Sequence, residues 1–328
     1  MSGQGYPLPV PGSSGETQRL GVQHELSVLD MNGDLFLSPL FYGQKQRRED
    51  EAQHNEREPA VRAVDIGTGT GVWACEVGKR YPSMHVIGLD LAVPTSLPSI
   101  PPNVRFAIQD VQAPWVPSVQ SAGPFDFIYG RQVLINLPDP RAALRQAWEN
   151  LRPGGFIEFR EFRNPFISEK SDQDDDDAVP FIVQWHRGTV EAAAKFGCDH
   201  RYAEKLPDEL ARQGFVDIHV VDHKIPVGGW APQSGDRAEK GEMERMRQLD
   251  MLSRELIRLS VPGLTNKMFI EGLGWSKERA QTYADKVLAE LSRQDLSADR
   301  ISLRFRMVWA RKPVESSTTH GNGILQGG

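Results

Sequence analysis

The chain has 328 residues, 39% of them hydrophobic and 25% charged, which is typical of a soluble globular protein with a sizeable core. Its formal net charge of −6 argues against nucleic acid as a direct partner, because phosphate binding needs clustered Lys and Arg. The two cysteines, Cys75 and Cys198, are too few for a disulfide framework or a zinc cluster, and they indicate a reducing compartment.

The N-terminal region has the composition of a surface segment. Residues 1–18 are rich in Gly, Pro and Ser and lack the apolar stretch of a signal peptide, so we expect disorder there. We expect residues 19–60 to pack on the core. The basic cluster Lys45-Gln46-Arg47-Arg48 is followed at once by acids, which favours a solvated face over a nuclear-import signal. No apolar run could span a membrane, so we expect no membrane partner and a cytoplasmic location, with a nuclear one as the alternative.

Strands alternate with helices between residues 61 and 162, and this region should form the core of the fold. The expected strands are 61–66, 84–91, 103–110, 125–130 and 156–162, and the expected helices are 71–82 and 140–155. Such alternation predicts right-handed crossovers and a parallel sheet covered by helices on both faces. We therefore predict an α/β fold with a doubly wound, Rossmann-like sheet that binds its ligand at the carboxyl ends of the strands.

Residues 163–312 should complete the sheet and add a cap. Two further helices are expected over 178–197 and 202–215, followed by strands over 216–227 and 302–313. In the first helix Phe181, Val190 and Ala194 should face inward, with Trp185 as a further candidate. The connection between these two strands is far longer than an ordinary loop and starts at the ligand side of the sheet. We expect it to be a helical lid that forms the substrate pocket. The acidic run Ser168–Asp177 should be a surface loop, and residues 313–328 a disordered tail.

The stretch VDIGTGTGVWA, beginning at Val64, lies where the first strand passes into the first helix. Its glycines at 67, 69 and 71 allow sharp turns and let a ligand approach the backbone without meeting a Cβ. A P-loop would need a Lys that is missing, and a dinucleotide fingerprint would need a small residue where Val72 stands. Asp65 would repel phosphates, so the pattern favours a ligand with positive charge.

The pattern Asp65-x-Gly67-x-Gly69-x-Gly71 resembles the first motif of the class I methyltransferases, whose cofactor is S-adenosyl-L-methionine. This cofactor carries an ammonium and a sulfonium group and no phosphate. The resemblance implies that Asp65 holds the amino group, directly or through water, and that the loop, including Thr68, surrounds the methionine part. It also implies a seven-stranded sheet in which the last strand runs antiparallel beside the sixth.

The ends of the next strands supply the other cofactor contacts that this resemblance implies. Asp90 ends the second strand, 19 residues after the last glycine of the loop, and would accept from both ribose hydroxyls, with Leu91 beside the adenine. Asp110 would accept from the adenine amine, with Val111 behind the ring, and Arg131 would border the methionine end. Taken singly, Asp90 or Asp110 could be an ordinary strand-end or turn residue. It is the occurrence of the glycine loop, Asp90 and Asp110 at the ends of successive strands that predicts a cofactor site.

The segments that flank the core narrow the resemblance. Two flanking segments are similar to the fungal LaeA-like methyltransferases: GVQHELSVLDMNGDLFLSPL before the core and PVGGWAPQSGDRAEKG after the sixth strand. The similarity to this family extends from about Leu20 to Pro313. This implies an enzyme that methylates oxygen or nitrogen of a small molecule in secondary metabolism. The alternatives are a regulator of secondary metabolism in a nuclear complex with velvet-type proteins, and a binding module without turnover. The intact glycine loop argues against the last, and the acidic balance favours the enzyme.

Three residues are candidates for a general base, which would help if the methyl acceptor is a hydroxyl group. They are Glu161 after the fifth strand, His186 in the first cap helix and His24 before the core. Each has a structural alternative, as a supporting acid, a helix-face residue and an anchor of the N-terminal segment respectively. His219 and His223 share a strand face without a third ligand, so we expect no metal site.

Overall fold

The computed structural model describes residues 8, 14–40, 61–168, 179–230, 240–293 and 296–314. The basic cluster at 45–48, the acidic run at 169–177 and the C-terminal tail beyond 314 lie outside the described residues.

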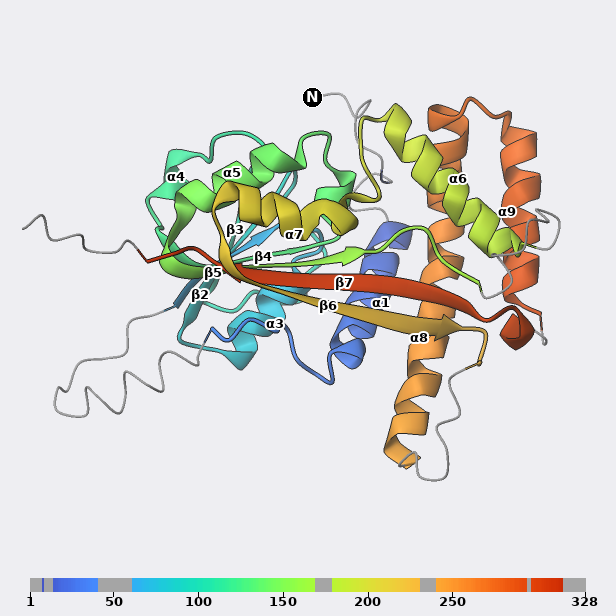
Figure 1. Ribbon diagram of the computed structural model, residues 1–328, viewed down its shortest axis with the longest axis horizontal. Helices are drawn as coiled ribbons and strands as arrows, with labels where there is room; N and C mark the ends of the chain where they lie inside the picture. Colours follow the sequence, from blue (N-terminus) through green and yellow to red (C-terminus); the bar gives the residue numbers. More distant parts are fainter. Residues whose placement is uncertain are drawn as a thin grey trace, which may run out of the picture.

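A seven-stranded sheet in the order β3-β2-β1-β4-β5-β7-β6 forms the centre of the molecule (Figure 1). Its strands are β1 Val61–Ile66, β2 Met84–Asp90, β3 Val104–Ile108, β4 Phe125–Arg131, β5 Leu151–Phe162, β6 Val216–Val227 and β7 Ile301–Arg311. The strands β1 to β5 pair in parallel, and β7 runs antiparallel between β5 and β6. The order confirms the predicted doubly wound fold and the antiparallel last strand beside the sixth.

Helices cover both faces of this sheet and form a separate group at one end of it. The helix bounds are α1 Ser14–Asp30, α3 Val72–Arg80, α4 Pro117–Gln120, α5 Pro140–Asn150, α6 Phe181–Lys195, α7 Tyr202–Gln213, α8 Lys240–Leu264 and α9 Lys277–Leu291, with short turns η1 Leu134–Asn136, η3 Thr265–Gly272 and η4 Leu296–Asp299. Figure 1 shows α3 on one face of the sheet and α4, α5 and α7 on the other.

Local signals explain where several of these helices begin and end. The Asp139 side chain accepts from the Ala142 amide at 2.9 Å and so caps the start of α5, where Pro140 occupies the first helical position. The helix α7 ends at Gly214, whose φ of 103° is in the left-handed region that glycine tolerates. The start of α5 and the end of α7 are therefore each determined by residues next to them in the chain.

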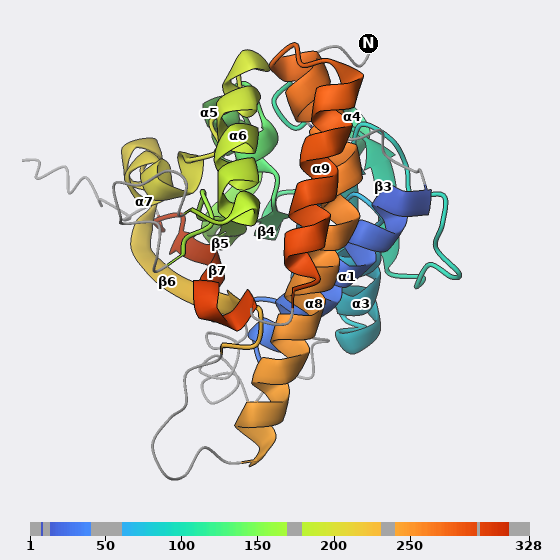
Figure 2. The same cartoon turned by 90° about the vertical axis from the view of Figure 1, so that its right-hand side faces the viewer.

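The long connection after β6 forms the predicted helical lid. It consists of α8, the π-helical turn η3 and α9, and Figure 2 shows these helices together with α6 at one end of the molecule. Their apolar side chains share one core with α1 and with parts of β6 and β7. In this core Trp185 is 1% exposed and its Nε1 donates to Thr265 Oγ1 at 2.9 Å. The lid is thus a packed body and not an extended loop.

Two expectations for the helices differ from the structure. Residues 14–18, placed in a disordered segment, form the first turn and a half of α1, whose polar side chains bond to one another along one face. In α6, Phe181 and Ala194 are exposed and Val190 is half-buried. The buried face of α6 includes Trp185, the further candidate, together with His186, because the lid and not the sheet decides which face of this helix is covered.

Candidate functional site

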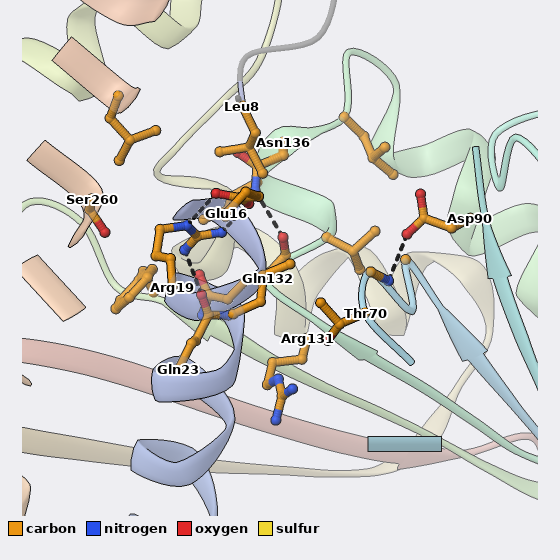
Figure 3. Close-up of a pocket in the computed structure, with 18 of the residues that line it drawn as sticks. Leu8, Glu16, Arg19, Gln23, Thr70, Asp90, Arg131, Gln132, Asn136 and Ser260 are labelled. Carbon is orange, nitrogen blue, oxygen red and sulfur yellow. Dashed lines mark hydrogen bonds and ion pairs between the residues drawn. The ribbon is translucent and has the colours of Figure 1, made fainter. Parts of the chain in front are cut away.

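A cavity of about 520 Å³ lies at the carboxyl ends of the parallel strands and continues beneath the lid. Its size is within the range of small-molecule sites. It is lined by residues of the glycine loop, the ends of β2 to β5, α1, α6, α8, η3 and β7. Figure 3 shows Asp90 and Ser260 at opposite ends of this cavity, with Glu16, Arg19 and Gln23 of α1 between them.

The glycine loop brings bare backbone to one end of the cavity. Gly67 and Gly69 line it with φ angles of 68° and 56°, values that L side chains rarely adopt. Among the described residues, a Cβ built on Gly69 would meet within 4 Å only the Leu20 side chain, at 3.4 Å, so the open side of this residue is the cavity. A ligand can therefore lie directly against this backbone.

The end of β2 is tied to the same loop. The Asp90 carboxylate accepts from the Gly69 amide and from the Leu91 amide, each at 2.7 Å. Burial raises the pKa of Asp90 above its usual value, although the two amide bonds act in the opposite direction. Because each carboxylate oxygen has more than one lone pair, Asp90 can still accept from a ligand's hydroxyl groups.

The structure places seven of the ten predicted cofactor residues on the cavity wall: Gly67, Gly69, Asp90, Leu91, Asp110, Val111 and Arg131. The other three, Asp65, Thr68 and Gly71, do not line it. That any of the ten contacts a cofactor stays a prediction.

Asp65 lies behind the loop, where it supports the turn. Its Oδ2 accepts from the Thr68 hydroxyl at 2.6 Å, and burial raises the pKa of Asp65 to about 7. A Cβ on Gly71 would come within 2.6 Å of the Phe106 ring, so this glycine is required for packing against β3. The structure therefore does not place Asp65 where it could hold a ligand's amino group directly.

Two of the three candidate bases are likewise outside the cavity wall. Glu161 is fully buried, and its Oε1 accepts from the amides of Val133 and Leu134 at 3.1 and 2.9 Å. Burial raises the pKa of Glu161 to about 8. This carboxyl group holds the turn after β4, which does line the cavity, and a positioning role fits it better than proton transfer.

His24 of α1 is held between two charged partners. Its Nε2 lies 2.5 Å from Glu76 Oε2, and its Nδ1 lies 3.1 Å from Arg131 Nη1. Burial, followed by the charge of Arg131, lowers the pKa of His24 to about 4. The residue anchors α1 and orients Arg131, in agreement with the structural alternative for it.

The sequence reasoning missed the wall that α1 contributes. Arg19 donates from Nε to Glu16 Oε2 and from Nη1 to Gln23 Oε1, both at 2.8 Å, and all three residues line the cavity (Figure 3). The signal was the spacing of these residues, three and four apart, which places them on one helix face. The Gly- and Pro-rich start of the chain concealed it.

The lid end of the cavity is formed mainly by apolar side chains: Phe162, Phe166, Trp185, Leu256, Ile257, Leu264, Met268 and Leu303. The lid end also contains five polar side chains: Asn164, His186, Thr189, His200 and Ser260. Of the three candidate bases, the structure thus places His186 on the wall. Within the described ranges, Asn164 Oδ1 and His200 Nε2 are buried without a hydrogen-bond partner.

No cluster of metal-binding side chains was found among the described residues. His223 bonds to Asp30 at 3.0 Å, and His219 stacks on Trp309 with ring centroids 4.8 Å apart. Cys75 and Cys198 are buried and free. None of the helices in the described part of the chain is long and apolar enough to span a membrane.

Comparison with known proteins gives a family match over more than half of the chain. The family model described as a methyltransferase domain matches residues 39–220. Methyltransferase pytC of Aspergillus terreus is 31% identical over 93% of this chain and 83% of its own length. Probable methyltransferase tdiE of Emericella nidulans is 28% identical over 84% and 76%. Secondary metabolism regulator LAE1 of Cochliobolus heterostrophus is 25% identical over 69% and 66%.

Proposed function

This chain belongs to the class I S-adenosylmethionine-dependent methyltransferases, in their LaeA-like group, and from that premise we propose that it methylates oxygen or nitrogen of a small molecule in fungal secondary metabolism. The observation that carries the proposal is the continuity of the cavity. It joins a bare glycine loop with a strand-end carboxylate at one end to an apolar lobe beneath the lid at the other. A concave, mainly apolar lobe of this kind suits a small molecule better than a protein side chain on a large surface.

The residues present fit S-adenosylmethionine, the cofactor of this family. The backbone of Gly67 and Gly69 leaves room for its methionine part, Asp90 can accept from the ribose, and Leu91, Asp110 and Val111 can border the adenine. When bound, the cofactor would supply a methyl group to the acceptor's lone pair and leave as S-adenosylhomocysteine, and the acceptor's proton would be released to solvent with the product. The chain's part is to align the acceptor and exclude water.

A regulatory role is the second candidate, since a relative named as a secondary metabolism regulator matches 69% of the chain. On this reading the protein would act in a nuclear complex with a velvet-type partner. Purification of the tagged full chain from its own cells would distinguish the two. A stoichiometric protein partner would favour regulation, and a monodisperse chain without one would favour the enzyme.

Calorimetric titration with S-adenosylmethionine and S-adenosylhomocysteine tests the proposal. We expect micromolar binding by the wild type and a loss of about 10- to 100-fold in Asp90→Ala, which removes a ligand for the ribose and the acceptor for two loop amides. The matched control is Asp34→Ala, at an exposed residue away from the cavity, which should bind as the wild type does. Folded wild type that binds neither compound would contradict the proposal.

A further inference from the structure

The lid end of the cavity differs in charge from the rest of it. The charged side chains that the described residues contribute to the cavity wall belong to α1 and to the ends of β2 to β4: Glu16, Arg19, Asp90, Asp110 and Arg131. Among the described residues, the segments that form the lid end contribute no Lys, Arg, Asp or Glu to the wall. A charged group that entered this lobe would lose its hydration without gaining a partner of opposite charge. The lobe therefore favours an uncharged molecule.

His186 is the polar residue of this lobe whose ring is most firmly fixed. It extends from α6 and stacks on the Phe166 ring, with centroids 3.5 Å apart and planes inclined by 16°. The Phe166 amide donates to His186 Nδ1 at 3.2 Å. The edge of Trp185 lies beside it, with ring centroids 6.1 Å apart. The imidazole thus has one orientation, set by its neighbours.

The bond from Phe166 also decides where the proton of the ring resides. Burial, with smaller contributions from His200 and Arg304, lowers the pKa of His186 well below its usual value, so the ring is neutral at physiological pH. Since Nδ1 accepts from a backbone amide, the single proton of the neutral ring is on Nε2. No described residue accepts a hydrogen bond from Nε2, although His186 lines the cavity. The ring therefore offers a ligand a donor and not a base.

We propose that His186 is a specificity-determining residue whose Nε2–H donates a hydrogen bond to the methyl acceptor, and that this acceptor is an uncharged, mainly apolar molecule carrying a hydrogen-bond-accepting oxygen or nitrogen. This inference rests on the proposed function, because it names the substrate class of the same cavity. It replaces the role of general base for His186, since the nitrogen open to a ligand already carries a proton.

Two substitutions separate the donor from the ring. His186→Phe keeps a ring that can stack on Phe166 and removes both nitrogens, whereas His186→Gln places an amide donor near the position of Nε2. Both variants are first titrated with S-adenosylhomocysteine, and their melting is followed by circular dichroism. We expect both variants to bind S-adenosylhomocysteine within twofold of the wild type. Residue 186 is at the lid end of the cavity, whereas the glycine loop and Asp90 form the other end, which we call the cofactor end.

The probes are isoquinoline, naphthalene and the N-methylisoquinolinium cation, titrated at pH 8 into protein saturated with S-adenosylhomocysteine and followed by NMR. Isoquinoline and naphthalene share a shape and differ in one accepting nitrogen, and the cation carries a fixed charge. In the wild type we expect isoquinoline to bind at least tenfold more tightly than the cation. We expect His186→Phe to weaken isoquinoline at least fivefold and naphthalene less than twofold. We expect His186→Gln to bind isoquinoline within threefold of the wild type.

Several results would overturn the proposal. They are an equal loss for isoquinoline and naphthalene in His186→Phe, equal binding of isoquinoline and the cation, and no saturable binding of isoquinoline to the loaded wild type. If His186→Phe does not fold, a fivefold loss of isoquinoline in folded His186→Gln would overturn it as well. Failure of folded wild type to bind S-adenosylhomocysteine is a separate result, which contradicts the proposed function instead.

Discussion

The two ends of the cavity are built in different ways. At the cofactor end, backbone and side chains come from short stretches at strand ends, such as the loop at 67–71 and the pair Asp90 and Leu91. At the lid end, the wall is assembled from side chains of α6 and of the contiguous α8 and η3, and α7 and β6 separate these two parts in the chain. The two ends thus draw most of their side chains from different segments of the chain. Substitutions at one end should therefore leave binding at the other end intact.

The largest expected effect is at the cofactor end, from Gly69→Val. The φ of 56° is unfavourable for a branched residue, and the new side chain would enter the cavity. We expect the affinity for S-adenosylhomocysteine to fall at least 100-fold in calorimetry. The matched control is Gly274→Val, which has a φ of 70°, lies beside the lid turn η3 and does not line the cavity. It should lose stability and keep its affinity within twofold. Similar losses of affinity in both variants would mean that backbone strain, and not the cavity, explains the effect.

A smaller effect is expected at the lid end, from Ser260→Leu. Ser260 lines the cavity, and its hydroxyl donates to the Leu256 carbonyl, so the larger side chain would fill part of the lobe. We expect isoquinoline to bind at least tenfold more weakly, with the affinity for S-adenosylhomocysteine unchanged within twofold. Ser292→Leu is the control. The Ser292 hydroxyl likewise donates to the carbonyl four residues earlier, that of Leu288, but Ser292 is exposed at the end of α9. A parallel loss of both ligands in Ser260→Leu would contradict the independence of the two ends.

A third effect concerns stability and not binding, and it comes from Glu161, which holds the turn between the two ends. Its pKa of about 8 in the folded protein exceeds its usual value, so the folded state binds this proton more tightly than the unfolded state. The free energy of unfolding should therefore fall as the pH rises from about 5.5 to 8, by at most about 1.4 kcal/mol per pH unit from this group. Glu161→Gln keeps the accepting oxygen and should flatten this fall, as measured by urea denaturation at the two pH values.

The control for this measurement is Glu149→Gln on the exposed face of α5. It should show the same dependence of stability on pH as the wild type. If Glu161→Gln does so too, the carboxyl group is not protonated in the folded protein, and its proposed positioning role would have to be carried by the charged form.

The sequence by itself determined the parts of this protein that depend on neighbours in the chain. The alternation of strands and helices predicted the sheet, and the Gly69 loop and Asp90 were predicted at strand ends that the structure brings together at one edge. These features follow from backbone sterics and hydrophobic periodicity, which act over a few residues. The motif did not specify whether Asp65 would act directly or through water, since whether a carboxylate faces a cavity or the loop behind it is decided by packing.

Only the tertiary structure decided the lid end. The buried face of α6 is set by contacts such as that of Trp185 with Thr265, 80 residues away, and the tautomer of His186 by an amide 20 residues before it. The wall from α1 depends on where a helix with a weak sequence signal packs. Side-chain contacts between residues so far apart in the sequence form only when the helices and strands pack together. The periodicity within one helix does not specify them.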